Sequence, residues 1–456
     1  MRTILAIAAI SIRNAIRSKL VIVLIAFLLL VLIGLPLTIR GDGTLTGHVR
    51  LLLQYTFGLA MLILSVATVW ASCAAISSEI RDRQIQMVLT KPVQAAQLWL
   101  GKWLGLTVLN GGLLLICAIG TYAALQWTTR PSQLSMEEQQ ELASEILIAH
   151  RPIAADEIDL SAEIERQYRA ARERGEWPAE IPTREVLPQI ERAVRAQANA
   201  VAPGQGRRWT FNLPRIPPSE EPLLLRYRFS TSVFDMEPID GVWLVGDPAR
   251  PDRERIEVQH AQRTTYTVPF DPSALNANQT LTLEFQNHNR EPVTVIFNPA
   301  ELHVLIPQGT FLGNYIKAML LLMIQLSFLA AIGLTAGAFL SVPVAALASF
   351  YFLLMLNAGR FIGRLAAREL HPGHHHAEPG LISQVFAAAS QVIYSALNLL
   401  IQPVYAANPL VPVAAGEWVS AGRVGYDLIV KVVVYSGVLL LLSVWHLRRK
   451  EVALPT

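Results

Sequence analysis

The segment from Glu79 to Lys102 concentrates residue types that could bind a partner protein. Charged side chains between Glu79 and Arg83 are followed by apolar positions and then by Pro92. The residue before a proline disfavours the helical region, so a short first helix should end there. A second helix begins near Gln94, and the two helices form an elbow. One face of the first helix should carry apolar side chains that need a cover, namely Ile85, Val88 and Leu89.

A second candidate for chemistry is a histidine-rich stretch, comprising His371, His374, His375 and His376. Imidazole is a good ligand for copper and zinc. A loop with four imidazoles can also bind these ions adventitiously, whereas a functional site usually holds its ligands on rigid elements with supporting partners. The stretch is therefore a weak metal candidate, and the sequence leaves the question open.

The sequence contains no pattern typical of an enzyme active site. It has no Gly-x-Ser-x-Gly, no His-Glu-x-x-His and no cysteine–histidine pairing. It also has no Gly-x-x-x-x-Gly-Lys-Ser/Thr phosphate loop, because the nearest Gly-Lys, at Gly101-Lys102, lacks the upstream glycine. We therefore expect that the chain is not an enzyme and holds no cofactor of its own.

Composition divides the 456 residues into two parts. The chain is 52% hydrophobic and 16% charged, against about 25% charged in an average soluble protein. Residues 127–310 hold 27 of the 35 acidic and 19 of the 38 basic side chains, a net charge of −8, and the remainder carries +11. This division excludes a single soluble globule, a disordered chain and a nucleic-acid binder with a broad basic face.

The elements that must position these residues are apolar stretches, six of which are long enough to cross a hydrocarbon core of about 30 Å. They cover about 20–39, 51–76, 98–126, two spans within 311–359 that break at Pro343, and 426–446. Short basic segments flank the first span, fill the 77–97 loop and follow the last span. The positive-inside rule places all three in the cytoplasm. The chain is then a multi-pass protein of the cytoplasmic (inner) membrane with both termini cytoplasmic.

Three further patterns lie at the membrane surface. Residues 1–18 predict an amphipathic helix in the inner leaflet, or simply a positive flank for the first span. Trp99, Trp103 and Trp127 suggest aromatic belts at the two ends of the third span. Residues 381–402 predict an outer re-entrant or interfacial helix, with a seventh span as the alternative.

The resulting fold class is a mainly α membrane protein. Six transmembrane helices carry a large extracytoplasmic insertion between spans three and four. Residues 1–126 contain the N-terminal helix, spans one to three and the cytoplasmic loop. Residues 127–310 form the extracytoplasmic domain, helical over 135–200 and, from its alternating apolar pattern, a small β-sandwich over 205–307. Residues 311–456 contain spans four to six.

The elbow resembles the coupling loop of type-2 ABC exporter permeases, and is most similar to permeases linked to multicopper-enzyme maturation. That family has a glutamate, a short helix, a Leu-Leu pair, a Pro-Val elbow and a Gly-Lys entering the third span. The matching positions are Glu79, Val88, Leu89, Pro92, Val93, Gly101 and Lys102. Arg83-Gln84 stands where the family often has Gly-Thr. The resemblance covers the six spans and not the large insertion.

The resemblance implies a permease subunit that couples ATP hydrolysis on a separate P-loop ATPase subunit to transport or to work on an extracytoplasmic substrate. ATP would be bound by that partner. The residues expected at its contact are Glu79, Arg81, Arg83, Ile85, Val88, Leu89, Pro92 and Lys102. The other expected partners are a second copy or a similar permease, membrane lipid, and a periplasmic protein or envelope substrate, but not nucleic acid. The alternative is a non-transporting anchor that displays the β-sandwich as a binding domain.

Overall fold

The structure is a computed structural model that describes residues 1–17, 19–38, 45–81, 94–130, 147–156, 159–175, 183–214, 222–233, 237–250, 253–276, 279–289, 292–354 and 409–449. The chain divides into two compact units. The helical unit comprises Met1–Leu142, Phe311–Ala415 and Val419–Thr456. The β-rich unit comprises Ala143–Thr310 together with Gly416–Trp418, a short segment that lies far along the chain from the rest.

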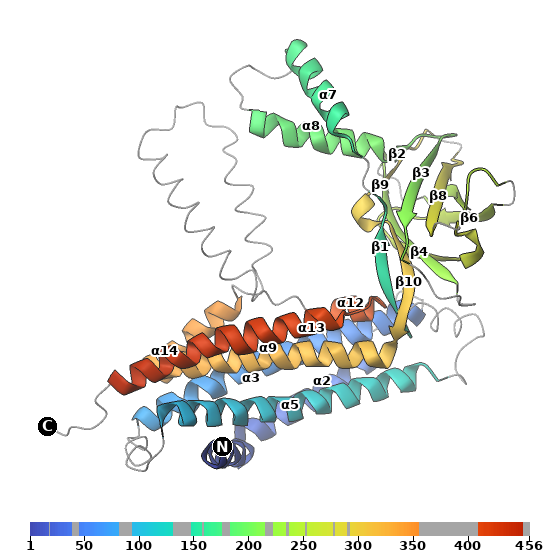
Figure 1. The fold of residues 1–456 in the computed structure, drawn as a ribbon. Helices are drawn as coiled ribbons and strands as arrows, with labels where there is room; N and C mark the ends of the chain where they lie inside the picture. Colours follow the sequence, from blue (N-terminus) through green and yellow to red (C-terminus); the bar gives the residue numbers. More distant parts are fainter. Residues whose placement is uncertain are drawn as a thin grey trace. The chain divides into compact units, whose positions relative to one another are not determined.

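Among the described residues of the helical unit, five helices are long and apolar enough to cross a membrane (Figure 1). They are α2 (Lys19–Thr38), α3 (Leu45–Arg81), α5 (Ala95–Thr128), α9 (Phe311–Phe339) and a continuous C-terminal helix made of α13 (Ala421–Asp427), η5 (Leu428–Tyr435) and α14 (Ser436–Arg449). The shorter helices are α1 (Arg2–Arg17), Val342–Leu354 and α12 (Leu410–Ala414). These helices make the chain a multi-pass membrane protein.

The break predicted near Pro343 is confirmed, since α9 ends at Phe339 and a new apolar helix covers Val342–Leu354. Over its described length that helix is shorter than a span, so the fifth predicted span, the second within 311–359, is not among the five long helices. The predicted outer helix 381–402 lies outside the described residues.

Three of the long helices run in the same direction. The ring of Phe57 in α3 meets that of Tyr315 near the start of α9 at 5.7 Å, and Gly337 near the end of α9 lies against Cys73 of α3. In the C-terminal helix, Ser443 donates to Thr335 of α9 at 3.0 Å. Helices α3, α9 and α14 are therefore mutually parallel.

Helix α5 runs antiparallel to α9. Near its beginning, the indole of Trp103 donates to the Ser327 carbonyl at 2.9 Å, and near its end the Ala118 carbonyl accepts from Tyr315. The interface-belt interpretation is wrong for Trp99, which is 1% exposed, whereas Trp127 is 62% exposed. The side chain of Trp99 packs against neighbouring helices instead of lying at the lipid interface.

Two pairs of glycines permit the closest helix contacts. In α5, a Cβ on Gly101 would lie 2.7 Å from Ile7, and one on Gly105 would lie 2.9 Å from the Ala8 carbonyl oxygen, so α1 packs directly on α5. In α9, Gly333 and Gly337 meet α3 in the same way. Glycines four residues apart are typical of close packing between membrane helices, and this spacing was a signal that the sequence analysis did not use.

Replacing Gly337 by alanine should destabilise the helical unit by about 1–3 kcal/mol, the usual cost of overpacking a core. The added Cβ would lie 2.5 Å from the Cys73 carbonyl oxygen, a backbone atom that cannot turn aside. The matched control is Gly34→Ala in α2, because nothing lies within 4 Å of a Cβ there. Thermal unfolding of the detergent-purified chain should separate the two variants, and equal midpoints would contradict the close contact.

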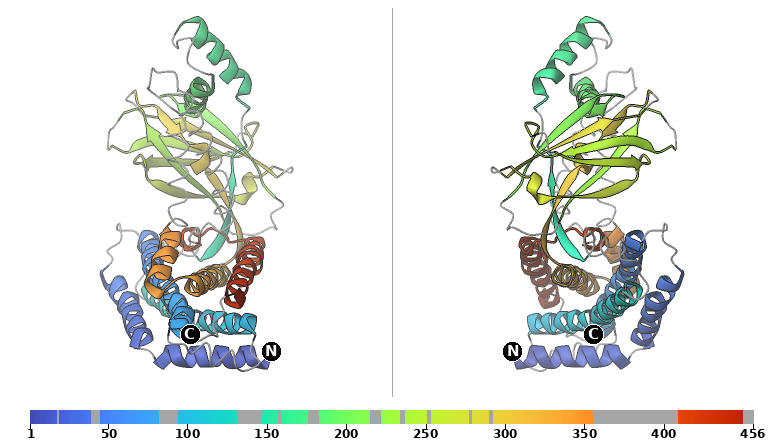
Figure 2. Two further views of the ribbon diagram at one scale, coloured as in Figure 1. Left: turned by 90° about the vertical axis from the view of Figure 1, so that its left-hand side faces the viewer. Right: turned by 90° about the vertical axis from the view of Figure 1, so that its right-hand side faces the viewer.

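The β-rich unit is built from two antiparallel sheets (Figure 2). One has the order β1-β10-β4-β9-β2 with β7 paired to β4, and the other the order β3-β8-β5-β6. The strands are β1 (Ile148–Ala154), β2 (Ala200–Val201), β3 (Gly206–Asn212), β4 (Leu223–Thr231), β5 (Ile239–Val245), β6 (Glu254–His260), β7 (Thr265–Phe270), β8 (Thr280–Asn287), β9 (Val295–Phe297) and β10 (His303–Thr310).

The two sheets share one aromatic core. Trp243 in β5 is fully buried, and its ring lies 5.0 Å from that of Tyr227 in β4 and 5.5 Å from that of Phe297 in β9. Trp209 in β3 contacts Phe297 at 5.1 Å. Contacts of this kind between strands of different sheets make the unit a sandwich.

Within the described part of residues 135–200, the expected helices are α7 (Ser161–Glu173) and α8 (Thr183–Ala198). Residues 148–154 instead form β1, which pairs with β10 from Ile148↔Thr310 to Ala154↔His303. An edge strand receives its hydrogen bonds from a distant partner, so the local pattern alone did not reveal it. The sandwich consequently begins well before residue 205.

Candidate functional site

The base of the predicted elbow is held by an ion pair between two helices. Lys102 lies about two turns into α5 and is 5% exposed. Its Nζ donates to Glu79 Oε1 at 2.5 Å and to the Ala75 carbonyl oxygen at 2.7 Å, both on α3. A buried ammonium is costly unless it is paired and hydrogen-bonded, and this one is both. The pair therefore ties together the two helices on either side of the loop.

The surroundings of this pair are apolar and tightly packed. The hydrophobic cluster at this place includes Ile76 of α3, Trp99 of α5, Leu334 of α9 and Leu447 of α14, each less than a tenth exposed. Ser77 adds a hydrogen bond to the Leu340 carbonyl at 3.1 Å. Four long helices thus meet at the end where α3 stops and α5 begins.

The structure reaches only part of the predicted partner contact. Glu79 and Lys102 are described and are brought together, with 29% and 6% of their side chains exposed. Arg81 is the last residue of α3, and the structure describes its backbone. The second helix of the elbow is confirmed as α5, whose N-cap is Gln94. The remaining contact residues, Arg83, Ile85, Val88, Leu89 and Pro92, lie outside the described residues, as do His371, His374, His375 and His376.

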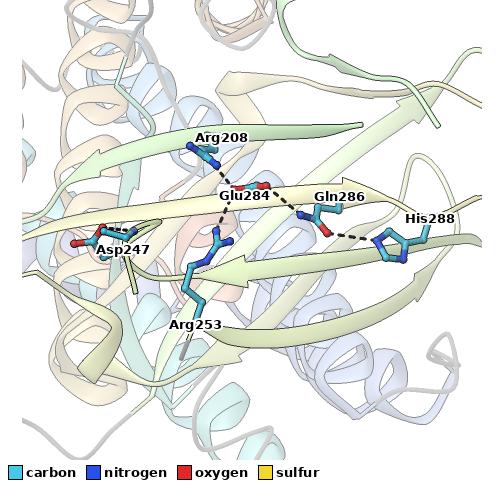
Figure 3. Close-up of polar contacts among 7 residues, drawn as sticks. Arg208, Asp247, Arg253, Glu284, Gln286 and His288 are labelled. Carbon is cyan, nitrogen blue, oxygen red and sulfur yellow. Dashed lines mark hydrogen bonds and ion pairs between the residues drawn. The ribbon is translucent and has the colours of Figure 1, made fainter. Parts of the chain in front are cut away.

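The β-rich unit carries a polar network on its four-stranded sheet (Figure 3). Glu284 accepts from Arg208 at 2.7 Å, from Arg253 at 3.1 Å and from Gln286 at 3.1 Å. Burial alone would raise the pKa of Glu284, but these hydrogen bonds outweigh it and hold the pKa below its ordinary value. Gln286 in turn contacts His288 at 3.4 Å. A carboxylate with its oxygens so occupied is suited to holding strands together rather than to moving protons.

Across the described ranges, no three His, Cys, Asp or Glu side chains gather closely enough to hold a metal ion. His260 Nδ1 lies 2.7 Å from the Tyr227 hydroxyl and its ring stacks on Tyr266 at 3.6 Å. These contacts place His260 in the packing of the sheet edge.

A third polar contact brings a distant segment into the β-rich unit. The backbone N–H of His150 in β1 donates to the Gly416 carbonyl at 2.7 Å, and its carbonyl accepts from Trp418 at 2.8 Å. Glu417 lies 3.4 Å from Arg226 Nη1. No sequence pattern indicated this segment, because it lies between two helices of the helical unit, α12 and α13, and carries no strand pattern of its own.

His150 should make stability depend on pH. Burial, reinforced by the positive charge of Arg226, lowers its pKa from 6.5 to about 4. Between these values the unfolded chain binds a proton that the folded chain does not. The contribution of His150 to the free energy of unfolding is therefore complete above pH 6.5 and is lost as the pH falls toward 4. This contribution amounts to about 3 kcal/mol at most.

Urea unfolding of the detergent-purified chain at pH 7 and pH 4.5, followed by tryptophan fluorescence, measures this loss. His150→Leu should reduce the difference between the two pH values. His288→Leu, at an exposed position, is the control and should leave it unchanged. An unaltered difference in His150→Leu would contradict the assignment.

Comparisons with family models, with curated proteins and with solved structures give no match to this chain.

Proposed function

We propose that this chain is the membrane subunit of a type-2 ABC exporter, driven by a separate P-loop ATPase. The observation that carries the proposal is the ion pair between the buried Lys102 and the half-buried Glu79 at the base of the elbow. An ATPase bound to a loop can do work on a membrane subunit only if the loop transmits force to the spans. A rigid junction between α3 and α5 meets that requirement.

The direction of the helices supports the same proposal. Because α3, α9 and α14 are parallel and α5 is antiparallel, the elbow and the end of α14 lie at one end of the helical unit. Helix α1 packs at that end through Gly101 and Gly105. The basic end of the unit, which the positive-inside rule assigns to the cytoplasm, is thus the end that carries the elbow.

In this proposal the ATPase binds the apolar face formed by Ile85, Val88 and Leu89, while Glu79, Arg81 and Arg83 lie at the rim. Pro92 sets the angle between the two elbow helices. The working unit is a homodimer or a pair with a similar permease, in the inner membrane with both termini cytoplasmic. The β-rich unit recruits a periplasmic protein or an envelope substrate on the outer side.

The competing proposal is an anchor that displays the β-rich unit without transport. The sandwich core and the Glu284 network would serve it equally well. An anchor, however, has no use for an elbow with a buried ion pair at its base. The two proposals therefore differ in whether the elbow binds an ATPase.

Replacing Leu89 by aspartate should weaken binding of the ATPase by about 1.5–3 kcal/mol, the value of burying one aliphatic side chain. The chain is co-expressed with the P-loop ATPase encoded nearest to it, and both co-purification and ATP turnover in lipid are measured. Thr90→Asp is the matched control, because it adds the same charge without removing an apolar group. If Leu89→Asp inserts normally and keeps full association and stimulation, the anchor is the better proposal.

A further inference from the structure

The helical unit encloses a cavity of about 360 Å³ that combines an apolar wall with polar groups. Its volume falls within the range of about 300–1,000 Å³ that is usual for ligand sites. The apolar wall comes from α3, α9 and the helix Val342–Leu354, through Met61, Leu62, Leu321, Leu322, Phe350 and Leu353. The polar groups are Ser65 on α3, Gln325 on α9, and Arg423, Asp427 and Lys431 on the C-terminal helix.

Gln325 points to a ligand because its amide has no hydrogen-bond partner among the described residues. The side chain lies near the middle of the 29-residue α9 and is 8% exposed. Neither its Oε1 nor its Nε2 makes a hydrogen bond. Burying an amide without hydrogen bonds costs free energy, and more so within the membrane. A bound polar group would supply the hydrogen bonds that this amide lacks.

The charged residues give this polar end a positive balance. Lys431 is 3% exposed, and its Nζ donates to Asp427 Oδ2 at 2.9 Å. Arg423, one turn before Asp427, is exposed at the rim. Two cations and one carboxylate leave one positive charge for a ligand to neutralise. Ionisable residues inside a membrane are expensive and usually mark functional sites.

The backbone at this place is also unusual. Residues Leu428–Tyr435 form a π-helix, and Ser436 Oγ donates to the Lys431 carbonyl at 2.9 Å. Segments of π-helix are rare and frequently occur at functional sites. Lys431 belongs to this π-helix and also lines the cavity.

From these observations we infer that the cavity binds an anionic amphiphile, an acyl chain that carries one carboxylate or phosphate. The acyl chain of the ligand lies against the apolar wall, and its anionic head lies between Gln325, Arg423 and Lys431. Two sources share this chemistry, a free fatty acid and an anionic phospholipid. Binding requires no ATPase, so its test is independent of the proposed function.

The probe is 11-(dansylamino)undecanoate, with its methyl ester as the uncharged analogue. Binding is followed by energy transfer from tryptophan to dansyl, using the full chain in phosphatidylcholine nanodiscs with empty nanodiscs as blank. The acid should bind at least about ten-fold more tightly than the ester, because hydrogen bonds to charged groups are worth about that ratio or more. Equal affinities would overturn the anionic assignment.

Two matched pairs of variants test the location. Gly58 lines the cavity, and a Cβ there would have nothing within 4 Å, so the side chain in Gly58→Leu should enter the cavity. Gly112 on α5 also has open space and does not line it, so Gly112→Leu is the control. We expect at least a ten-fold loss of binding in Gly58→Leu and none in Gly112→Leu. Unchanged binding in Gly58→Leu would overturn the site.

The second pair concerns the amide. Gln325→Leu should weaken binding of the acid. The control is Asn110→Leu, because Asn110 is another buried amide whose Nδ2 has no hydrogen-bond partner among the described residues. Asn110 does not line the cavity, so its replacement should leave binding unchanged. Equal effects in the two variants would also overturn the site. Competition by unlabelled dodecanoate or by phosphatidylglycerol in the nanodisc then identifies the source, and a failure of both to compete counts against the inference.

Discussion

Replacing Glu79 by alanine is expected to destabilise the helical unit by about 3–5 kcal/mol, the cost of removing one partner of a buried ion pair. The change leaves the ammonium of Lys102 buried, and its hydrogen bond to the Ala75 carbonyl oxygen at 2.7 Å remains. Because Glu79 is itself 29% exposed, the loss should lie toward the lower end of that range. Thermal unfolding in detergent measures it.

Two further variants separate charge from packing. Glu79→Gln should cost less, because its amide oxygen can still accept from Nζ. The double variant Glu79→Ala with Lys102→Met should recover much of the loss, since it removes the orphaned charge. If the double variant is less stable than Glu79→Ala alone, the pair is not the dominant contact at the elbow base.

The second large effect is expected in the sandwich, where Trp243→Ala should destabilise the β-rich unit by about 3–5 kcal/mol. Trp243 is fully buried and contacts four aromatic rings, those of Trp209, Tyr227, Phe285 and Phe297. Its removal leaves a cavity where the two sheets meet. Denaturant unfolding followed by far-ultraviolet circular dichroism at the β-sheet band measures the change.

Trp243→Phe retains an aromatic ring and should lose less stability than the alanine variant. Arg255→Ala on the edge strand β6 is the surface control, because its ion pair with Glu257 is largely exposed and worth about 0–1 kcal/mol. Comparable losses in Trp243→Ala and Arg255→Ala would contradict a core centred on Trp243.

Apolar length and charge determined much of this architecture from the sequence. Each of the five long apolar helices falls where a span was predicted, because twenty or so apolar residues can satisfy their backbone only as a helix in lipid. The start of α5 at Ala95 followed from the proline at 92. The alternating pattern around Leu223 and Leu281 likewise predicted strands β4 and β8, since side chains alternate across a sheet.

Tertiary structure alone decided which of these residues touch. Glu79 and Lys102 were both predicted to meet a partner, yet their pairing depends on α3 and α5 lying side by side. Strand β1 and the segment Gly416–Trp418 depend on hydrogen bonds to residues far along the chain. The unpaired amide of Gln325 depends on four helices enclosing one cavity. Local patterns report what a segment can bury, whereas pairing and burial are properties of segments brought together by the fold.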